Sequence, residues 1–400
     1  MIPLTHEKQL LFESTKEAKE KGVAYQYLDA GEFSGRNVSI KGNEVLNFGN
    51  CCYLGLEIHP DIKQGAIEAT KKYGSLLSNS RGYFSSPLYA ELEGYLKRIF
   101  PGNPVVTTTT TLGHCAVLPV LIEENDVILL DQYVHNSVRM AASLCKANGT
   151  NLTVVRHNDM DHLSDVIERK KKNGARNIWY LADGIYSMQG DKLKLGGLIQ
   201  LLNHHDQFYT YIDDAHGMSW LGKNGAGYVM GNGEIHERMI VAVSMCKSFG
   251  AFGGIIVFPN TDWAERIRLF GQTMLFSAPV SPPILGAAIA SAKIHLSEKL
   301  ECLQNELMDK ICYFREKCRQ ANILIKTEDE TPIQFIEIGD NSLVYDMVKK
   351  LMERGVYVTI AAYPSMPKKH GGLRINITRH LTFEDIDYLI QQLIELGVNQ

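Results

Sequence analysis

Short, almost continuously apolar runs alternate with helix-like stretches along most of this chain, and this alternation constrains the fold more than any other feature. Strands that are buried on both faces of a sheet have this apolar character. Strands that alternate with helices are typical of a parallel sheet. The sequence therefore predicts an α/β fold with a largely parallel sheet. The runs expected to form its strands are 127–130, 152–155, 178–181, 208–212, 239–243 and 254–257.

The two ends of the chain follow a different pattern. The first residues, up to about Gly22, predict a polar helix, and a hairpin is expected over 38–48. After Ser281 two prolines precede a helical stretch that we expect over about 283–322. The elements expected beyond it are strands at 332–338, 356–360 and 373–377 and helices near 342–354 and 383–396.

A chain of 400 residues is longer than one ordinary domain. We expect an N-terminal helix and hairpin (1–46), a large domain (47–281) and a small C-terminal α+β domain (282–400). Thr382 is followed three residues later by Asp385, which is the spacing of a capping box and predicts the start of the last helix.

Composition excludes several classes of function. The net charge of -4 gives no basic footprint for nucleic acid. No apolar run approaches the roughly 20 residues of a transmembrane segment, and the N-terminus lacks the layout of a signal peptide. The eight cysteines include no CxxC pair, so we expect no metal site and reduced thiols. These features predict a cytoplasmic protein.

Polar residues that follow the predicted strands indicate a cofactor site. Lys247 comes after the apolar run 240–243, and Asp213 ends a strand 34 positions earlier. His135 and Ser187 follow two other strands. In an open parallel sheet, ligands bind beyond the carboxyl ends of the strands. A lysine that forms a Schiff base and an acid that pairs with the pyridinium nitrogen are what pyridoxal 5'-phosphate requires.

Each of these residues has an ordinary structural alternative. An aspartate at a strand end is commonly a helix cap, and a loop histidine commonly has no catalytic role. The combination of these residues, in this order and with this spacing along the chain, favours the cofactor site.

The motifs that extend this pattern cover nearly the whole chain, from about Asn47 to Leu393. They are Tyr53-Leu54-Gly55-Leu56, His157-Asn158-Asp159, Gly184 to Asp191, Asp213-Asp214-Ala215-His216-Gly217, the Lys247 segment and Leu373-Arg374-Ile375. In this order they resemble the α-oxoamine synthases, enzymes of fold type I that depend on pyridoxal 5'-phosphate. The resemblance implies a large domain with a mostly parallel seven-stranded sheet and a homodimer with its active site at the interface.

The resemblance also implies roles for individual residues around the cofactor ring. Lys247 would hold the cofactor and later act as the general base. Asp213 would bind the pyridine nitrogen, and His216, helped by Ser187, would hydrogen-bond the phenolic oxygen. His135 would stack on the ring and later help to position the acyl group.

Other residues would hold the phosphate and the substrate. Ser244 and the helix start at Thr110-Thr111-Leu112 would bind the phosphate, the latter through backbone N–H groups. Arg374 would take the amino-acid carboxylate in a two-pronged salt bridge. The family's asparagine before Tyr-Leu-Gly is replaced by Cys51-Cys52, so Asn50 and Cys51 are the expected neighbours of that carboxylate.

Further departures from the family pattern surround the substrates. Thr110-Thr111 replace a glycine and an aromatic residue, and Ala278 replaces a threonine that contacts the phosphate from the partner subunit. The resemblance implies an acyltransferase that condenses a small amino acid with an acyl thioester, carried by coenzyme A or a carrier protein, usually with decarboxylation to an α-aminoketone. The alternatives are another reaction of the same fold, such as transamination or aldol cleavage, and a non-catalytic subunit of a synthase.

Overall fold

The structure is a computed structural model that describes residues 5–398. Two compact units divide the chain. The sheet unit contains residues 59–187 and 192–304. The terminal unit contains the described residues up to 58, residues 188–191, and the described residues from 305 onward.

A seven-stranded sheet with the order β3-β9-β8-β7-β6-β4-β5 forms the centre of the sheet unit. The neighbours from β8 to β5 run parallel, and β9 is antiparallel to both β8 and β3. The predicted mostly parallel sheet is confirmed. Its strands are β3 (Asn103–Thr107), β4 (Val127–Asp131), β5 (Asn151–Val155), β6 (Ile178–Asp183), β7 (Phe208–Asp213), β8 (Met239–Ser244) and β9 (Gly254–Phe258).

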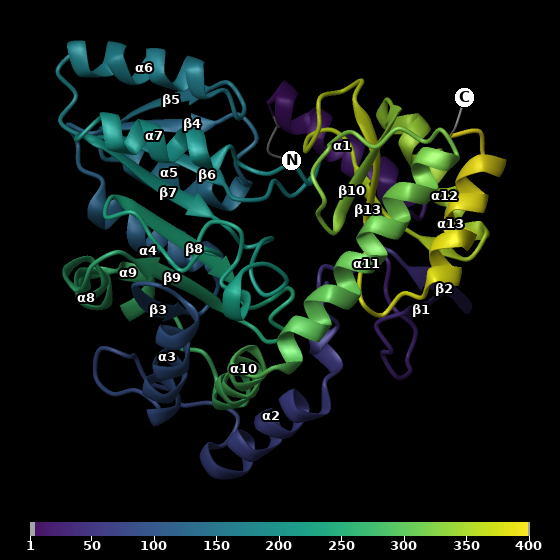
Figure 1. Cartoon of the computed structure of the whole chain (residues 1–400), viewed down its shortest axis with the longest axis horizontal. Coiled ribbons are helices and arrows are strands. Elements are labelled where there is room, and N and C mark those ends of the chain that lie inside the picture. The colour runs from purple at the N-terminus through teal and green to yellow at the C-terminus, as the bar shows by residue number, and fades with distance from the viewer. Residues whose placement is uncertain (1–4, 399–400) are drawn as a thin grey trace. The chain divides into compact units, whose positions relative to one another are not determined.

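Helices cover both faces of this sheet (Figure 1). On one face, buried residues of α4, α5 and α8 pack against the strands. On the other face, α3, α6, α7 and α10 form the second half of the core. The helices are α2 (Pro60–Tyr73), α3 (Pro87–Ile99), α4 (Thr110–Leu121), α5 (Asn136–Ala147), α6 (Met160–Lys172), α7 (Leu195–His204), α8 (Thr261–Phe270), α9 (Gln272–Leu275) and α10 (Pro282–His295).

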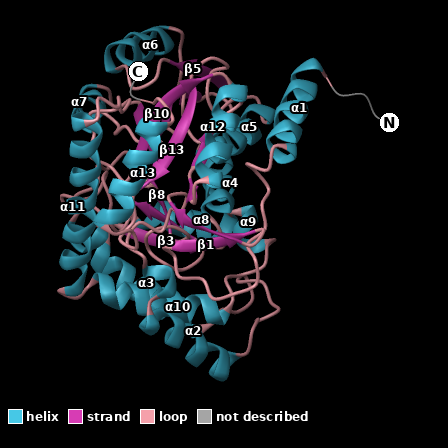
Figure 2. Cartoon of the chain, turned by 90° about the vertical axis from the view of Figure 1, so that its right-hand side faces the viewer, coloured by secondary structure: helices cyan, strands magenta, loops and turns pink. Residues whose placement is uncertain are grey.

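The predicted helical stretch at 283–322 forms two helices, α10 and α11 (Lys299–Gln320). α10 lies beside α2 (Figure 2). An added Cβ at Gly65 of α2 would come within 2.5 Å of the carbonyl oxygen of Gly286 in α10, so the two helices can approach this closely only because both residues lack a side chain. This packing groups α10 with the sheet unit. The predicted domain boundary lies at Pro282, the first residue of α10, and so assigns α10 to the small domain.

The terminal unit contains two small sheets with the strand orders β1-β2-β11 and β10-β13-β12. The predicted N-terminal hairpin is confirmed, because β1 and β2 pair antiparallel. The predicted capping box is present at Thr382 and Asp385. The elements are α1 (His6–Glu20), β1 (Asn37–Ile40), β2 (Asn43–Asn47), β10 (Ile333–Gly339), α12 (Asn341–Glu353), β11 (Val356–Tyr357), β12 (Thr359–Ala361), β13 (Gly371–Asn376) and α13 (Phe383–Glu395).

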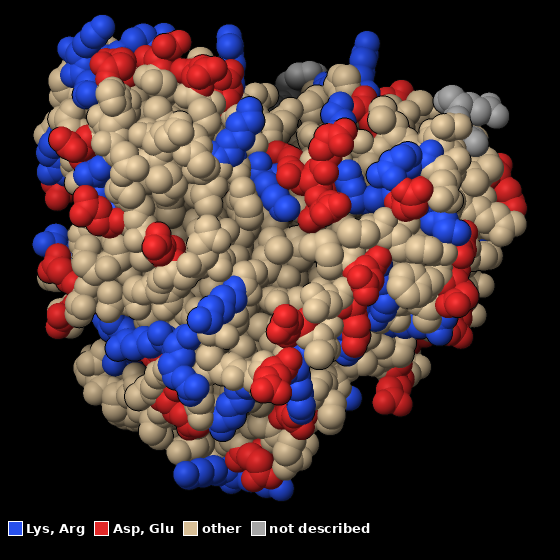
Figure 3. Space-filling model, viewed as in Figure 1, with Lys and Arg blue, Asp and Glu red and all other residues tan. Residues whose placement is uncertain are grey.

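Neither the surface charge nor the helices of the described residues show a single dominant feature. On the face shown in Figure 3, acidic and basic side chains are interspersed. Within residues 5–398, no helix combines the length and the apolar character that are needed to cross a bilayer.

Candidate active site

The sheet topology brings several polar residues to one edge. β6 ends at Asp183 and β7 ends at Asp213, and these residues are direct partners in the parallel register. β8 ends at Ser244, which pairs with Gly254 at the start of β9. Gly254 also pairs with Thr107, the last residue of β3, and α4 begins three residues later. The carboxyl ends of the strands and the first turn of α4 therefore meet, which is where open α/β sheets bind ligands.

A cavity of 170 Å³ lies at this edge. One water needs only roughly 10–15 Å³ of such space, so the cavity has room for a larger ligand. The predicted site residues that line it are Thr110, Thr111, His135, Asp213, His216, Ser244 and Lys247. The cavity is also lined by residues that were not predicted, namely Thr109, Ser137, Asp183, Ala215 and Cys246.

The two neighbouring carboxyl groups, Asp183 and Asp213, have opposite pKa shifts. Burial and the charge of Asp213 raise the pKa of Asp183 well above its ordinary value. Burial would also raise the pKa of Asp213, but the hydrogen bond from His114 and the charge of Lys247 lower it to about 2. Asp213 is therefore a buried carboxylate that stays ionised at neutral pH, which suits it to pair with a cation.

His114 is the main polar residue that sequence reasoning missed behind the cavity. It is fully buried in α4. Its Nε2 lies 3.1 Å from Oδ2 of Asp213, and its Nδ1 lies 2.7 Å from the hydroxyl of Tyr211. The second oxygen of Asp213, Oδ1, accepts a hydrogen bond from the backbone N–H of Ala215 at 3.1 Å. Both carboxylate oxygens thus have protein partners.

His135 is fixed at the start of α5 from two directions. Its Nδ1 lies 2.7 Å from the hydroxyl of Ser137, and its backbone N–H donates to Oδ1 of Asp183 at 3.0 Å. Burial, with a smaller contribution from Lys247, lowers the pKa of His135, although the charge of Asp213 opposes this. A neutral imidazole is therefore favoured at this wall of the cavity.

His216 lies in a turn that is organised by the buried side chain of Asp214. Asp214 Oδ2 accepts a hydrogen bond from the backbone N–H of Val229 at 2.9 Å. Burial raises the pKa of Asp214 to about 7. The carboxyl group fills space that side chains would otherwise need, because an added Cβ would lie 2.4, 2.2 and 2.5 Å from its oxygens at Gly184, Gly217 and Gly227. The motif glycines Gly184 and Gly217 therefore have a steric explanation.

The first turn of α4 offers backbone donors to the cavity. Thr109 caps the helix by accepting a hydrogen bond from the N–H of Leu112 at 3.1 Å. The first N–H groups of an α-helix have no acceptor within the helix, and here they include those of Thr110 and Thr111. An added Cβ at Gly254 would come within 2.6 Å of the nitrogen of Thr110, so glycine is required where the helix meets the sheet.

Among the described residues, two of the predicted cofactor contacts, Leu112 and Ser187, lie outside the cavity lining. Leu112 donates its N–H to Thr109. Ser187 is buried, four residues after the end of β6. The phosphate role of Leu112 and the ring role of Ser187 stay predictions.

The three predicted substrate-binding residues belong to the terminal unit. Arg374 lies in β13 and is only 5% exposed. Both of its terminal nitrogens lie 3.7 Å from the sulfur of Cys51, and the side-chain nitrogen of Asn376 lies 3.6 Å from the same sulfur. Arg374 and Cys51 are thus brought together, and Asn376 is a neighbour that sequence reasoning missed.

Asn50 points its amide toward other partners. Its Nδ2 donates to Glu57 at 2.6 Å, and its Oδ1 accepts from the backbone N–H of Cys52 at 2.9 Å. These bonds give Asn50 a structural role in the turn before Tyr53. Its contact with a substrate stays a prediction.

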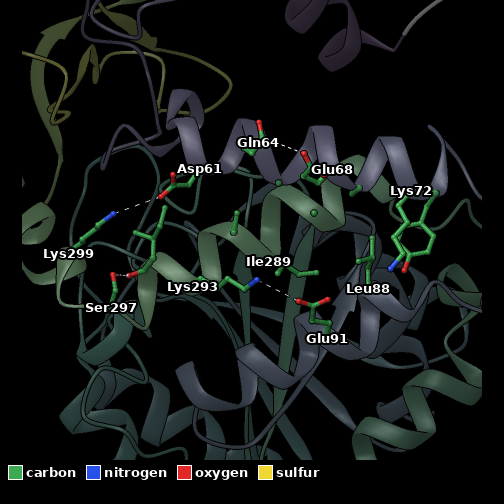
Figure 4. A pocket seen from close by; sticks show the side chains of 16 residues that line it. Asp61, Gln64, Glu68, Lys72, Leu88, Glu91, Ile289, Lys293, Ser297 and Lys299 are labelled. Carbon is green, nitrogen blue, oxygen red and sulfur yellow. Dashed lines mark hydrogen bonds and ion pairs between the residues drawn. The ribbon is translucent and has the colours of Figure 1, made fainter.

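A larger groove of 650 Å³ in the sheet unit lies along α2, α3 and α10 (Figure 4). Two of its lysines form ion pairs with acids, Lys293 with Glu91 at 3.8 Å and Lys299 with Asp61 at 3.9 Å. Size alone does not make this groove the site of chemistry, because the perturbed acids, the histidines and Lys247 gather at the smaller cavity.

The residues present fit pyridoxal 5'-phosphate. The cofactor requires an amine for its aldehyde, an anion for its ring nitrogen and donors for its phosphate. Lys247, the ionised Asp213 and the start of α4 with Ser244 supply these groups around one cavity. Fold and site together therefore define a transferase of fold type I that depends on pyridoxal 5'-phosphate.

Known proteins of the same kind span almost the entire chain. A family model described as aminotransferase class I and II matches residues 43–393. The 8-amino-7-oxononanoate synthase of Alkaliphilus metalliredigens is 31% identical over 98% of this chain and 98% of its own length. A serine palmitoyltransferase of Sphingobacterium spiritivorum is 26% identical over 96% of this chain and 94% of its own.

A solved structure supports the fold. The serine palmitoyltransferase of S. paucimobilis with PLP and myriocin bound superimposes with a TM-score of 0.89 at 21% identity, over 99% of this chain and 98% of that one. The chain belongs to the aminotransferase class I and II family, and within it to the α-oxoamine synthases, which are acyltransferases dependent on pyridoxal 5'-phosphate.

Proposed function

We propose that this chain joins a small amino acid to an acyl thioester and releases carbon dioxide and the free thiol, which yields an α-aminoketone. The observation that carries this proposal is the cavity in which Lys247, the ionised Asp213, His135 and His216 meet the first turn of α4. The family to which the chain belongs supports acyl transfer as the reaction.

When bound, pyridoxal 5'-phosphate supplies an aldehyde for amines and a ring that accepts electron density from Cα. Lys247 would hold that aldehyde and later move the proton at Cα of the amino acid. Asp213 keeps a negative charge beside the ring nitrogen, and its low pKa suits this role. His135 would pack on the ring, His216 would donate to its phenolic oxygen with help from Ser187, and Ser244 with the start of α4 would bind the phosphate.

We assign the carboxylate of the amino acid to Arg374. The planar guanidinium group matches a carboxylate with two parallel hydrogen bonds. Arg374 is buried in β13, away from competing water, and its terminal nitrogens contact the sulfur of Cys51, which Asn376 also contacts. Glycine, alanine and serine are the substrates to test first, with acyl groups on coenzyme A or on a carrier protein.

Transamination and aldol cleavage would begin at the same lysine, so Lys247 and Asp213 do not separate them from acyl transfer. The curated relatives named above favour the acyltransferase, since they are synthases and a palmitoyltransferase. A non-catalytic subunit is disfavoured by the retention of Lys247 and its cavity.

The test is a screen of amino acids against acyl thioesters of different chain length, with release of thiol and of carbon dioxide measured in parallel. The wild-type protein with pyridoxal 5'-phosphate is expected to release both in equal amounts for one amino acid. Lys247→Ala should release neither. Lys293→Ala is the matched control, because it removes an exposed lysine from the larger groove and should leave both rates unchanged.

Two results would contradict the proposal. Thiol release in the Lys247→Ala variant at the wild-type rate would show that this lysine is not the reactive amine. Amino-group transfer to a keto acid without thiol release would indicate an aminotransferase instead.

We also propose that the chain works as a homodimer. Large apolar side chains are exposed on two neighbouring loops of the sheet unit: Tyr83 (86%), Phe84 (61%) and Phe276 (85%). The hydroxyl of Ser80 donates to the carbonyl of Leu275 at 2.7 Å, which holds these loops side by side. An exposed apolar surface of this kind is typical of an interface.

Sedimentation velocity tests the dimer directly. The wild-type protein should sediment as a dimer, and Phe276→Asp should shift it toward monomer. A monomeric wild-type protein at micromolar concentration would exclude the homodimer.

We further propose a cytoplasmic enzyme, because all eight cysteines are free thiols, as expected in a reducing compartment.

A further inference from the structure

His114, a buried polar residue next to Asp213, has no role in the proposed reaction. His114 lies in α4 among apolar neighbours, including Ala116, Val117 and Leu118, and none of its side-chain surface is exposed. A buried polar group is costly unless its hydrogen bonds are satisfied. Both ring nitrogens of His114 have partners, Tyr211 on one side and Asp213 on the other.

The chemistry of Asp213 fixes the direction of one of these hydrogen bonds, and the protonation state of His114 sets the other. The ionised carboxylate of Asp213 can only accept, so Nε2 of His114 must carry a proton and donate it. When His114 is a neutral imidazole, Nδ1 is then an acceptor and the hydroxyl of Tyr211 donates to it. Burial raises the pKa of Tyr211 well above its ordinary value, which keeps that hydroxyl protonated. The result is a directed chain from Tyr211 through His114 to Asp213.

The placement of α4 makes this chain possible. An added Cβ at Gly113 would come within 2.9 Å of Ile256 and 3.0 Å of Thr107. Glycine at this position therefore lets the helix lie close enough to the sheet for His114 to reach Asp213. The same helix provides Thr110 and Thr111 at its first turn. A single rigid element thus holds both the phosphate donors and the partner of the carboxylate.

We propose that His114 is a positioning residue that, supported by Tyr211, holds the carboxylate of Asp213 ionised and oriented for the ring nitrogen of the cofactor. This inference rests on the proposed function, because it concerns the binding of pyridoxal 5'-phosphate. His114 itself does not line the cavity among the described residues, so it acts only through Asp213.

Two substitutions separate the hydrogen bond from the volume of the side chain. His114→Leu fills the space but donates nothing, which leaves Asp213 short of a partner. His114→Gln keeps an N–H donor at a similar distance from the backbone. Since hydrogen bonds to charged groups are strong, we expect His114→Leu to weaken cofactor binding roughly tenfold to hundredfold, and His114→Gln to stay within about threefold of the wild type.

Two spectroscopic measurements distinguish positioning from a merely structural role. With ¹⁵N-labelled histidine, the protein should show His114 protonated at Nε2 and not at Nδ1, and Tyr211→Phe should disturb this signal. With ¹⁵N-labelled pyridoxal 5'-phosphate, the ring nitrogen should be protonated in the wild type and lose protonation in His114→Leu. His295→Asn is the matched control, because His295 is also buried but bonds a backbone carbonyl in α10.

The outcomes are distinguishable. Normal cofactor binding by the wild type, with unchanged affinity and ring protonation in His114→Leu, would overturn this inference and leave the proposed function intact. A tautomer with the proton on Nδ1 would also overturn it. If the wild type bound no pyridoxal 5'-phosphate, the proposed function would fall and the inference with it.

Discussion

Gly217→Ala is expected to destabilise the sheet unit strongly, although it adds only one methyl group. The added Cβ would lie 2.2 Å from Oδ1 of Asp214 and 2.8 Å from the backbone nitrogen of Tyr228. The side chain of Asp214 is fully buried and has no room to move away. A shift would also break its hydrogen bond from Val229.

The magnitude follows from these two costs. Overpacking of a buried site costs about 1–3 kcal/mol. Loss of a hydrogen bond to a carboxyl group adds about 1.5–3 kcal/mol if that group is charged, and about 1 kcal/mol if it is neutral. A total near 3 kcal/mol corresponds to a fall in melting temperature of roughly 6–12 °C for a unit of this size.

The assay is thermal unfolding of the cofactor-free protein, followed by circular dichroism. Gly94→Ala in α3 is the matched control, because an added Cβ there meets nothing within 4 Å. Alanine has the higher helix propensity, so this variant should be more stable by about 0.5–1 kcal/mol. If Gly217→Ala melted at the wild-type temperature, the steric explanation of this motif glycine would be refuted.

Three further predictions concern the buried acids and the substrate. In the folded chain the pKa of Asp214 is about 7, against an ordinary value of 3.8. The folded chain therefore keeps a proton that the unfolded chain loses, so the stability of the fold falls as pH rises through this window. Melting curves of Asp214→Asn from pH 4 to 8 should lack this fall. Asp213→Asn keeps the shape but not the charge, so titration with pyridoxal 5'-phosphate should show binding weakened by roughly tenfold or more; equal affinity would argue against the ion pair. Arg374→Lys keeps the charge but loses the planar fork, so KM for the amino acid should rise roughly tenfold while cofactor binding is unchanged.

Most strands of the sheet unit were predictable because they are buried on both faces. The runs at 127–130, 178–181 and 239–243 all lie inside β4, β6 and β8. β3 was missed because two prolines and a glycine lie in or just before it, which suggests a loop. Pro104 is tolerated there because β3 is an edge strand, with no further neighbour for a backbone N–H to bond.

The boundary between the two units was harder to predict, since it depends on packing over long sequence distances. The expected helix at 283–322 divides into α10 and α11. Nothing in the local sequence indicates that Gly286 of α10 meets Gly65 of α2, more than two hundred residues away. Helical periodicity therefore predicted that this stretch is helical, but not that α10 packs against α2.

The residues that we propose to be catalytic were predicted from their positions after strands and from family motifs, whereas the supporting residues were not. Lys247, Asp213, His135 and His216 line one cavity. His114 carries no comparable signal, because one polar residue in an apolar helix is compatible with many roles. Only the three-dimensional structure reveals that its two ring nitrogens meet Tyr211 and Asp213.

Reductive trapping tests the central claim most directly. Wild-type protein is mixed with pyridoxal 5'-phosphate, reduced with borohydride and digested, and the modified peptide is identified by mass spectrometry. We predict that the phosphopyridoxyl group is attached to Lys247, at the carboxyl edge of the sheet beside Asp213. A label on a different lysine, or no label at all under these conditions, would contradict the proposed site.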